Sequence, residues 1–382
     1  MQEPRRIVEL ALEAGFDLAA LVPLAPPRDG DHFERWLAAG HQAGMDWFER
    51  QRARILDPRR IDPGARSLLV VGLGHARPAG RAPLGRGTEE ARIARYALGR
   101  DYHNLIQKRL RKLSKELAGA GLVGTGRVLV DAGPLLERSH AQEAGLGFIS
   151  KSANLLHPDH GPWFFLGELF LDLELSPEDF PSQPPAGSCG TCTACLDACP
   201  TDAIIAPGRI DANRCISYQT IENRGSVPHA LRPRLGPWVF GCDVCSEVCP
   251  WGDGAPDRSG EFGTHPFVER AQRPGGILEW LRQTEEEFVS RTPGSPLRRP
   301  GRDALARNVA LALGNLPGEA GLATLPAALD DRSPLVRAAA FWALYHAHAS
   351  DRPAREALSR ARAREWDPAA AEDMDQTLRE HG

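Results

Sequence analysis

Hydrophobic positions in the first 175 residues follow two periods, one typical of helices and one typical of buried strands. Ile7, Leu10, Ala11 and Ala14 recur at helical intervals, and a glycine follows them as a stop signal. A basic amphipathic pattern over 105–117 predicts a second helix, which ends near two further glycines.

Three continuous apolar runs, at 67–73, 127–131 and 163–175, predict buried strands. The last run is interrupted by Glu168 and Asp172, and no stretch of the chain reaches the roughly 18 apolar residues that a membrane span needs. Because helical patterns separate the strands, the sequence predicts an α/β or α+β domain.

Beyond residue 175 the composition and the predicted secondary structure change three times, so the overall fold class is expected to be α+β with several domains. Residues 176–188 contain four prolines and are typical of a linker, and 276–288 has the pattern of one or two helices within a loop-rich region. The predicted divisions are 1–175, 176–255, 256–300 and 301–382.

The C-terminal division is predicted to be helical. Helical patterns cover 302–315, 322–329 and 331–344, and the last has an Asp, a Pro at its start and then Val, Arg and small residues. This order resembles the second helix of a HEAT-type repeat, a unit of roughly 40 residues that stacks as helix pairs. An ordinary helical bundle is the alternative.

Length and charge narrow the function classes. At 382 residues the chain should form two to four domains, and its net charge of −4 excludes a uniformly basic nucleic-acid binder. Residues 50–115 nevertheless hold 17 Lys and Arg against 5 Asp and Glu, which indicates a local anion-binding face. The N-terminus shows no apolar signal region, so we expect a cytoplasmic protein.

All eight cysteines lie between Cys189 and Cys249, which is typical of a metal module in a reducing compartment. The first run has the spacing of the bacterial iron–sulfur motif, three cysteines at intervals of three and a fourth before a proline. In such motifs the fourth cysteine belongs to the neighbouring cluster. The pattern predicts two [4Fe–4S] clusters, one held by Cys189, Cys192, Cys195 and Cys249 and the other by Cys199, Cys215, Cys242 and Cys245.

Two other metal or cofactor interpretations fit less well. Structural zinc prefers paired cysteine knuckles in a set of four. Gly72 and Gly74 follow a predicted strand, but Arg77 stands where a dinucleotide fingerprint needs its third glycine, so a plain strand-end turn is favoured.

Six segments together resemble the epoxyqueuosine reductase family, from about residue 3 to about residue 348. They are Arg-Tyr-Ala-Leu-Gly-Arg-Asp-Tyr-His at 95–103, Asp-Ala-Gly-Pro-Leu-Leu-Glu-Arg at 131–138, Ala-Gly-Leu-Gly-Phe at 144–148, Phe-Phe-Leu-Gly-Glu-Leu at 164–169, and the cysteine-containing segments 215–222 and 239–251.

The resemblance implies a cobalamin-dependent oxidoreductase related to reductive dehalogenases. It would remove the epoxide oxygen of epoxyqueuosine at the wobble position of a tRNA anticodon, using two electrons and two protons. Electrons would pass from an external low-potential donor, of the flavodoxin or ferredoxin type, through the clusters to cobalt. The first division would then be an α/β cobalamin-binding catalytic domain, 176–255 a ferredoxin-like domain, and the helical tail a tRNA-docking surface; we expect a monomer.

Asp131 matches the proton donor that the family implies. It ends an apolar strand, and a positioned acid commonly accelerates such a step by about 10²–10⁴-fold. A free aspartate has a pKa of roughly 3.9, so this role requires a pKa raised by burial. A helix-capping or turn aspartate is the alternative.

The resemblance also implies cobalamin bound base-off, without a protein ligand below cobalt. Asp101, Tyr102 and His103 come nearest to a cobalt-ligating motif, but Ile106 replaces its glycine, so His103 is interpreted as a structural or substrate-side residue. Ser150 and Ser152 depart from the Gly-Lys-Asn pattern usual in the family. The implied cofactor contacts are Arg54, Tyr96, Asp131, Arg138, Ser150, Lys151, Asn154, Leu155, Ser217, Cys242 and Asp243.

RNA binding requires basic groups that neutralise phosphate. The candidate tRNA contacts are Arg224, Arg298, Arg299 and Arg302, with Arg307 and the 50–66 stretch as further candidates; a solvated charged face is the alternative. Two other functions stay open at this point. A reductive dehalogenase would share both cofactors, and a ferredoxin-type electron carrier would need only the clusters.

Overall fold

The computed structural model describes residues 2–75, 91–180, 187–252, 259–273, 276–316 and 320–381. The chain divides into two compact units, and each takes its residues from three separate segments. The first unit draws on Met1–Arg77, Asp101–Asn213 and Val244–Phe262, and the second on Pro78–Arg100, Arg214–Asp243 and Gly263–Gly382. These limits differ from the four predicted divisions, which remain a prediction.

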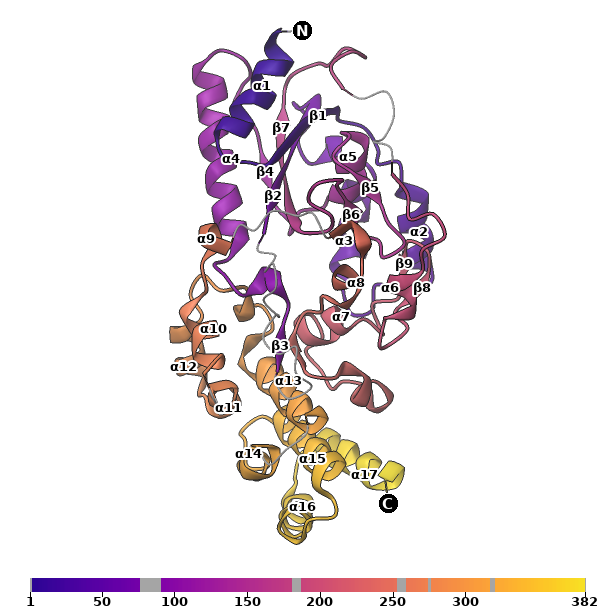
Figure 1. Ribbon diagram of the computed structural model, residues 1–382, viewed down its shortest axis with the longest axis vertical. Helices are drawn as coiled ribbons and strands as arrows, with labels where there is room; N and C mark the ends of the chain where they lie inside the picture. The colour runs from indigo at the N-terminus through magenta and orange to yellow at the C-terminus, as the bar shows by residue number, and fades with distance from the viewer. Residues whose placement is uncertain are drawn as a thin grey trace. The chain divides into compact units, whose positions relative to one another are not determined.

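The first unit is built on a four-stranded sheet with the order β1-β2-β7-β4 (Figure 1). Each neighbouring pair is antiparallel. Of the two classes predicted for this domain, α/β is therefore wrong and α+β is correct, because helices lie between the strands in sequence without making parallel crossovers. The strands are β1(Leu18–Pro23), β2(Ser67–Gly74), β4(Val128–Leu129) and β7(Phe164–Leu171).

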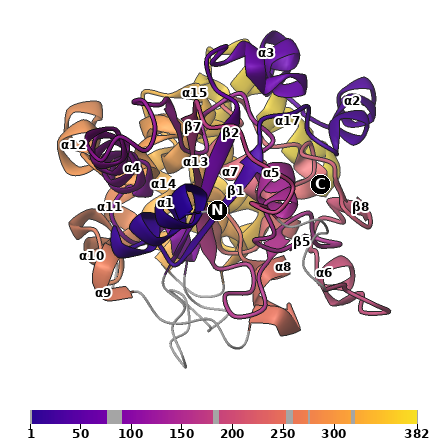
Figure 2. The ribbon, with the colours of Figure 1, turned by 90° about the horizontal axis from the view of Figure 1, so that it is seen from above.

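Helices cover both faces of this sheet, and the view from above separates α1 and α4 from α5 (Figure 2). α4 packs against β7 so closely that a side chain at Gly167 would collide with Ile106. On the other face, Phe170 of β7 joins a buried apolar cluster with Ala141 and Ala144 at α5. Successive residues of a strand point to opposite faces, so Glu168 lies on the α5 side with Phe170.

The first unit also contains the helices that cover the sheet and several short helices and strands. They are α1(Gln2–Glu13), α2(Gly30–Ala38), α3(Trp47–Leu56), η1(Pro58–Arg60), α4(Tyr102–Gly119), α5(Glu137–Glu143), β5(Phe148–Ile149), β6(Leu155–Leu156), α6(Ala194–Asp197), β8(Ile204–Ala206), β9(Arg209–Ile210), α8(Val244–Glu247), η5(Pro250–Gly252) and α9(Ser259–Phe262).

The second unit is mainly helical. α13 is buried along most of its length and packs against α15, which also contacts α14, α16 and α17. The elements are β3(Arg92–Ile93), η2(Arg95–Ala97), α7(Ile216–Ile221), η3(His229–Leu231), η4(Pro233–Leu235), β10(Trp238–Phe240), α10(Pro266–Ala271), α11(Gly276–Arg282), α12(Glu285–Arg291), η6(Pro296–Arg298), α13(Gly301–Asn315), α14(Ala320–Ala328), α15(Pro334–His348), α16(Arg352–Arg364) and α17(Pro368–His381).

Most predicted elements are confirmed, with shifted ends. The amphipathic helix predicted over 105–117 begins earlier, at Tyr102, because the carboxylate of Asp101 caps it by accepting a hydrogen bond from the backbone N–H of His103 at 3.0 Å. The strand predicted over 127–131 is reduced to Val128–Leu129. The helices predicted at 302–315, 322–329 and 331–344 correspond to α13, α14 and α15, while the HEAT-type assignment remains a prediction.

Some predictions fall partly outside the described residues. These are 76–90 of the basic stretch, including Arg77, and 181–186 of the linker. Gly72 and Gly74 lie within β2, and the backbone N–H of Gly74 donates to the carboxylate of Asp17 at 2.7 Å, so the turn predicted at these two glycines is wrong. No helix among the described residues is long and apolar enough to cross a bilayer.

Candidate active site and cluster-binding loops

Asp131 lies just beyond β4, between the first residues of α4 and α5. Its backbone is in the left-handed region, with a φ of 56°, which is uncommon for a residue with a side chain and is often found at functional sites. The left-handed turn explains why the predicted strand stops at Leu129. It also leaves the Asp131 side chain 58% exposed.

Two side chains from the start of α4 contact the Asp131 carboxylate. The hydroxyl of Tyr102 donates a hydrogen bond to Oδ2, and Nε2 of His103 lies 3.3 Å from the same oxygen. Nδ1 of His103 lies 2.7 Å from the carboxylate of Asp101, so the imidazole sits between two carboxylates. His103 therefore lies beside the candidate acid, while its role as a structural or substrate-side residue stays a prediction.

These contacts set the charges at the site. The surrounding protein alone would raise the pKa of Asp131, but hydrogen bonds from His103 and Tyr102 reverse this effect and lower it. Burial alone would lower the pKa of His103, but Asp101 and Asp131 raise it to about 9. The raised pKa expected for Asp131 is therefore wrong for the free protein, in which Asp131 is ionised and His103 is cationic at neutral pH.

Two further carboxyl groups lie behind Asp131, and the sequence analysis assigned no role to either. Oε1 of Glu137, the first residue of α5, accepts a hydrogen bond from the backbone N–H of Asp131 at 2.6 Å. Glu168 of β7 is fully buried, and its carboxyl group faces that of Glu137. Burial, followed by repulsion from Asp131, raises the pKa of Glu137 to about 8. Burial and the neighbouring Glu137 raise the pKa of Glu168 well above its ordinary value.

A sequence signal for Glu168 was present. It is the charged residue that interrupts the apolar run of β7, and a buried ionisable residue without a counter-charge is rare unless it has a function. Glu137 and Tyr102 carried no such signal, because their importance depends on the fold that brings them to Asp131.

All eight cysteines are free thiols, as a cluster-binding module requires. Six belong to the first unit, and Cys215 and Cys242 belong to the second. Burial and then repulsion from Cys189 raise the pKa of Cys195, and Cys189 and Cys192 also raise the pKa of Cys249. Cys249 therefore lies beside the first cysteine run although 50 or more residues separate them, which supports the crossed ligand set.

Hydrogen-bond donors reach several of these sulfur atoms. The backbone N–H of Lys151 lies 3.4 Å from Sγ of Cys189, and that of Ala203 lies 3.2 Å from Sγ of Cys199. Nδ2 of Asn154 lies 3.8 Å from Sγ of Cys245. Such donors stabilise the negative charge on cluster sulfurs and raise the reduction potential. No group of three or more His, Cys, Asp or Glu in the described ranges is arranged to hold a metal ion.

The segment 150–155 links the Asp131 region to the cysteine loop. Nζ of Lys151 donates to the carbonyls of Gly190 and Cys192 at 2.8 and 2.9 Å. Arg138 of α5 donates to the carbonyl of Ala153. The hydroxyls of Ser150 and Ser152 are buried and lie 2.9 Å apart, so they contact each other.

The remaining predicted cofactor contacts are divided between the units. Arg54 is exposed on α3, where it donates to Gln51, and Leu155 is buried in β6. Tyr96, Ser217, Cys242 and Asp243 belong to the second unit. There the buried Asp243 carboxylate accepts a hydrogen bond from the backbone N–H of Arg95 at 2.7 Å, which fixes the turn before Tyr96.

The candidate tRNA contacts differ in exposure. Arg298 is exposed, Arg224 is exposed and donates to the carbonyls of Ile221 and Arg299, and Arg299 forms an ion pair with Glu222 at 3.0 Å. Arg302 is only 4% exposed and forms a bidentate ion pair with Asp331, so its prediction as a phosphate contact is wrong.

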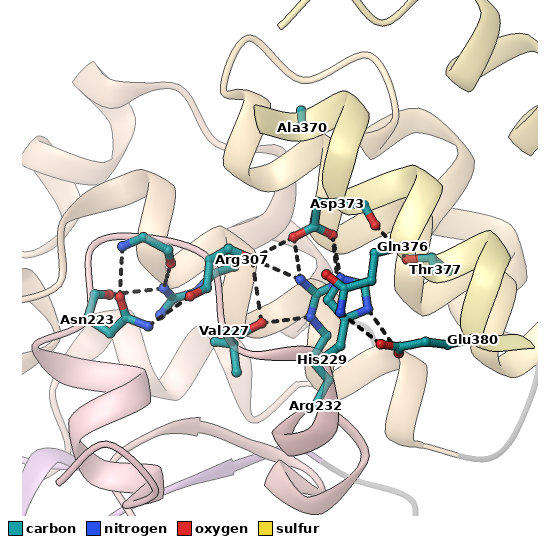
Figure 3. Close-up of polar contacts among 12 residues, drawn as sticks. Asn223, Val227, His229, Arg232, Arg307, Ala370, Asp373, Gln376, Thr377 and Glu380 are labelled. Atoms are coloured by element: carbon teal, nitrogen blue, oxygen red, sulfur yellow. Dashed lines mark hydrogen bonds and ion pairs between the residues drawn. The ribbon is translucent and has the colours of Figure 1, made fainter. Parts of the chain in front are cut away.

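Arg307 is also buried, and its prediction is wrong for the same reason. Its guanidinium donates to the backbone carbonyls of Gln219 and Asn223 at 2.6 and 2.9 Å and to that of Gly225 (Figure 3). The carbonyls, rather than RNA phosphates, satisfy its donors. Arg307 therefore holds the exposed loop that carries Arg224.

Comparisons with known proteins agree with these features. A family model described as "Epoxyqueuosine reductase QueG, DUF1730" matches residues 55–132, and one described as "4Fe-4S double cluster binding domain" matches residues 188–252. The epoxyqueuosine reductase of Xanthomonas campestris pv. campestris is 43% identical over 345 residues, which are 89% of this chain and 94% of that protein. The Pseudomonas aeruginosa enzyme is 41% identical over 87% of this chain and 91% of its own length.

A solved structure agrees across the whole chain. The crystal structure of an epoxyqueuosine reductase with a tRNA-Tyr epoxyqueuosine-modified stem loop has a TM-score of 0.83 and 26% sequence identity, and the match covers 99% of this chain and 98% of that one.

Proposed function

The chain belongs to the epoxyqueuosine reductase family of oxidoreductases, and we propose that it removes the epoxide oxygen of epoxyqueuosine in the anticodon of tRNA. The main support for this proposal is the 43% sequence identity to the Xanthomonas campestris pv. campestris enzyme over 94% of its length. The tRNA stem loop bound to a structural relative supports tRNA as the substrate. The reaction consumes two electrons and two protons, and it converts the epoxide to an alkene and water.

We propose that the double-cluster domain holds its clusters in the crossed arrangement, with Cys249 completing the set of Cys189, Cys192 and Cys195. The proximity of Cys249 to the first cysteine run supports this assignment. Cys199, Cys215, Cys242 and Cys245 would hold the second cluster. Together the clusters would carry single electrons from an external low-potential donor.

We also propose cobalamin as the cofactor at Asp131, on the family resemblance. Its amide side arms need both donors and acceptors, and the exposed guanidiniums of Arg54 and Arg138 and the backbone of 150–155 fit such a ligand. Lys151 and Asn154 instead use their side chains on the cysteine loops, so they would act by shaping the pocket. When bound, cobalamin would supply a reduced cobalt that accepts the cluster electrons and acts on the epoxide.

The chain's own residues would supply the protons. Asp131 is proposed as the donor to the epoxide oxygen, although it is ionised in the free protein and must first gain a proton. The cationic His103 lies 3.3 Å from Oδ2 and can provide it. Tyr102 holds the carboxylate in place through its hydroxyl hydrogen bond.

The test uses tRNA from cells that lack this activity, incubated anaerobically with the reconstituted, reduced protein. Nucleoside mass spectrometry should show that epoxyqueuosine loses one oxygen. An unchanged nucleoside mass, from protein that retains its clusters and corrin, would refute the proposed reaction.

A further inference from the structure

The proton transfer proposed for Asp131 and His103 gives no role to the two carboxyl groups behind Asp131, those of Glu137 and Glu168. The reaction consumes two protons, and His103 accounts for one stored beside Asp131. We propose that Glu137 and Glu168 share a proton and act as positioning residues that hold Asp131 in place and supply it with the second proton. This inference rests on the proposed function.

The surroundings of Glu168 require its carboxyl group to be protonated or to share a proton with a neighbouring group. It is fully buried in the middle of β7, and its partners across the sheet, Val70 and Leu129, are apolar and buried. Transfer of an isolated carboxylate into such surroundings is so unfavourable that the group normally takes up a proton. Glu137, at the start of the helix that packs on β7, faces the Glu168 carboxyl group.

Glu137 connects this buried proton to the site. Its Oε1 accepts the backbone N–H of Asp131 at 2.6 Å, and this contact holds Asp131 in its left-handed conformation. Within the part of the chain that the structure describes, Asp131 repels both Glu137 and Glu168, Arg138 on α5 attracts Glu137, and His103 lies on the far side of Asp131.

The proton balance is complete without a further reactant. Both carbon–oxygen bonds of the epoxide break, the two electrons come from the external donor through the clusters, and the oxygen leaves as water with two protons. One proton would come from His103 and one from the Glu137–Glu168 pair, each by way of Asp131. Both stores would then refill from solvent.

The first experiment needs neither cofactor turnover nor tRNA. Infrared spectroscopy of the purified protein in D₂O at neutral pH should show the carbonyl stretch of a protonated carboxylic acid. Glu168→Gln should weaken and shift this band, because it removes one of the two carboxyl groups that share the proton, whereas Glu174→Gln, an exposed carboxylate just beyond the end of β7, should preserve it. Absence of the band in the wild-type protein, or an unchanged band in Glu168→Gln, would overturn the shared proton.

The second experiment tests the proton supply through single-turnover rates of the holoenzyme against pH. The wild-type rate should fall as the pH passes about 8, where Glu137 loses its proton. Glu137→Gln and Glu168→Gln should be at least about tenfold slower at neutral pH, since positioned proton donors contribute about 10²–10⁴-fold, and should lose this alkaline limb. Glu174→Gln should match the wild type.

The two experiments distinguish a failure of the proposed function from a failure of the proposed proton supply. A wild-type protein that removes no oxygen would refute the proposed function, while the infrared band would still report the pair. An active wild type with variants of unchanged rate and pH profile would leave the function standing and refute the proton supply.

Discussion

The carboxylate of Glu137 accepts a hydrogen bond from the backbone N–H of Asp131, with 2.6 Å between Oε1 and N. This contact joins the first residue of α5 to a residue with a φ of 56°. Strained backbone conformations of this kind typically require about 1–3 kcal/mol of support from their surroundings. The surroundings here are themselves ionisable, so the geometry of the site depends on protonation.

The first prediction concerns Asp131. Asp131→Ala should retain both clusters and the corrin, because the contacts of its side chain within the described residues are with Tyr102 and His103, yet its single-turnover rate should fall by about 10²–10⁴-fold. Iron analysis, the visible spectrum and nucleoside mass spectrometry measure the three quantities. Loss of the cofactors together with the activity would assign Asp131 a structural role instead.

The second prediction concerns stability against pH. Glu137 has a folded pKa of about 8, above its ordinary value of 4.5, so its contribution to stability is full below pH 4.5 and is lost as the pH rises through 8. His103, with a folded pKa of about 9 against 6.5, contributes stability that is lost between these values. Both effects have the same sign, so the unfolding temperature should decrease between pH 5 and 9.

Glu137→Gln should reduce this pH dependence, because glutamine does not titrate. Differential scanning fluorimetry at a series of pH values, with Glu174→Gln as the control, measures the change. A slope in Glu137→Gln as steep as in the wild type would contradict the assignment of the raised pKa to Glu137.

The sequence predicted the cysteine module and the long elements well, because they depend on spacing and periodicity within short stretches. The strand at 67–73 and the helices at 302–315 and 331–344 are examples. Prediction from the sequence failed for properties that depend on the three-dimensional surroundings of a side chain, such as its pKa and its burial. The low pKa of Asp131 comes from His103 and Tyr102, and the burial of Arg302 comes from Asp331, about 30 residues away in sequence. Neither contact leaves a local pattern.

The third prediction concerns the cysteine loop. Asn154→Leu removes the side-chain donor that lies 3.8 Å from Sγ of Cys245, so it should lower the reduction potential of the second cluster. A redox titration followed by electron paramagnetic resonance measures the potential. Asn104→Leu, at an exposed asparagine of α4, is the matched control and should leave both potentials unchanged. An unshifted potential in Asn154→Leu would show that this contact does not tune the cluster.

The fourth prediction concerns the C-terminal helix. Asp373 of α17 forms an ion pair with the buried guanidinium of Arg232 and also contacts His229 at 3.2 Å (Figure 3). Asp373→Ala would leave a buried charge without its partner, which typically costs about 3–5 kcal/mol. We expect a lower unfolding temperature. Glu372→Ala, which removes one partner of an exposed pair with Arg379, should change stability by less than about 1 kcal/mol.

The last prediction separates arginines that can contact RNA from those that hold the fold. Arg224 and Arg298 are exposed, so Arg224→Ala and Arg298→Ala should weaken stem-loop binding and reduce its salt dependence by roughly 0.7–0.9 per lost phosphate contact. Arg298→Ala should leave the unfolding temperature unchanged, whereas Arg224→Ala also loses the hydrogen bonds to the carbonyls of Ile221 and Arg299. Arg302→Ala should instead lower the unfolding temperature, because Asp331 would lose its buried partner. Filter binding across a salt series, together with thermal melts, measures both. If Arg224→Ala and Arg298→Ala left affinity and salt slope unchanged, the tRNA-binding face would have to lie elsewhere, and the exposed basic residues of 50–66 would be the next to test.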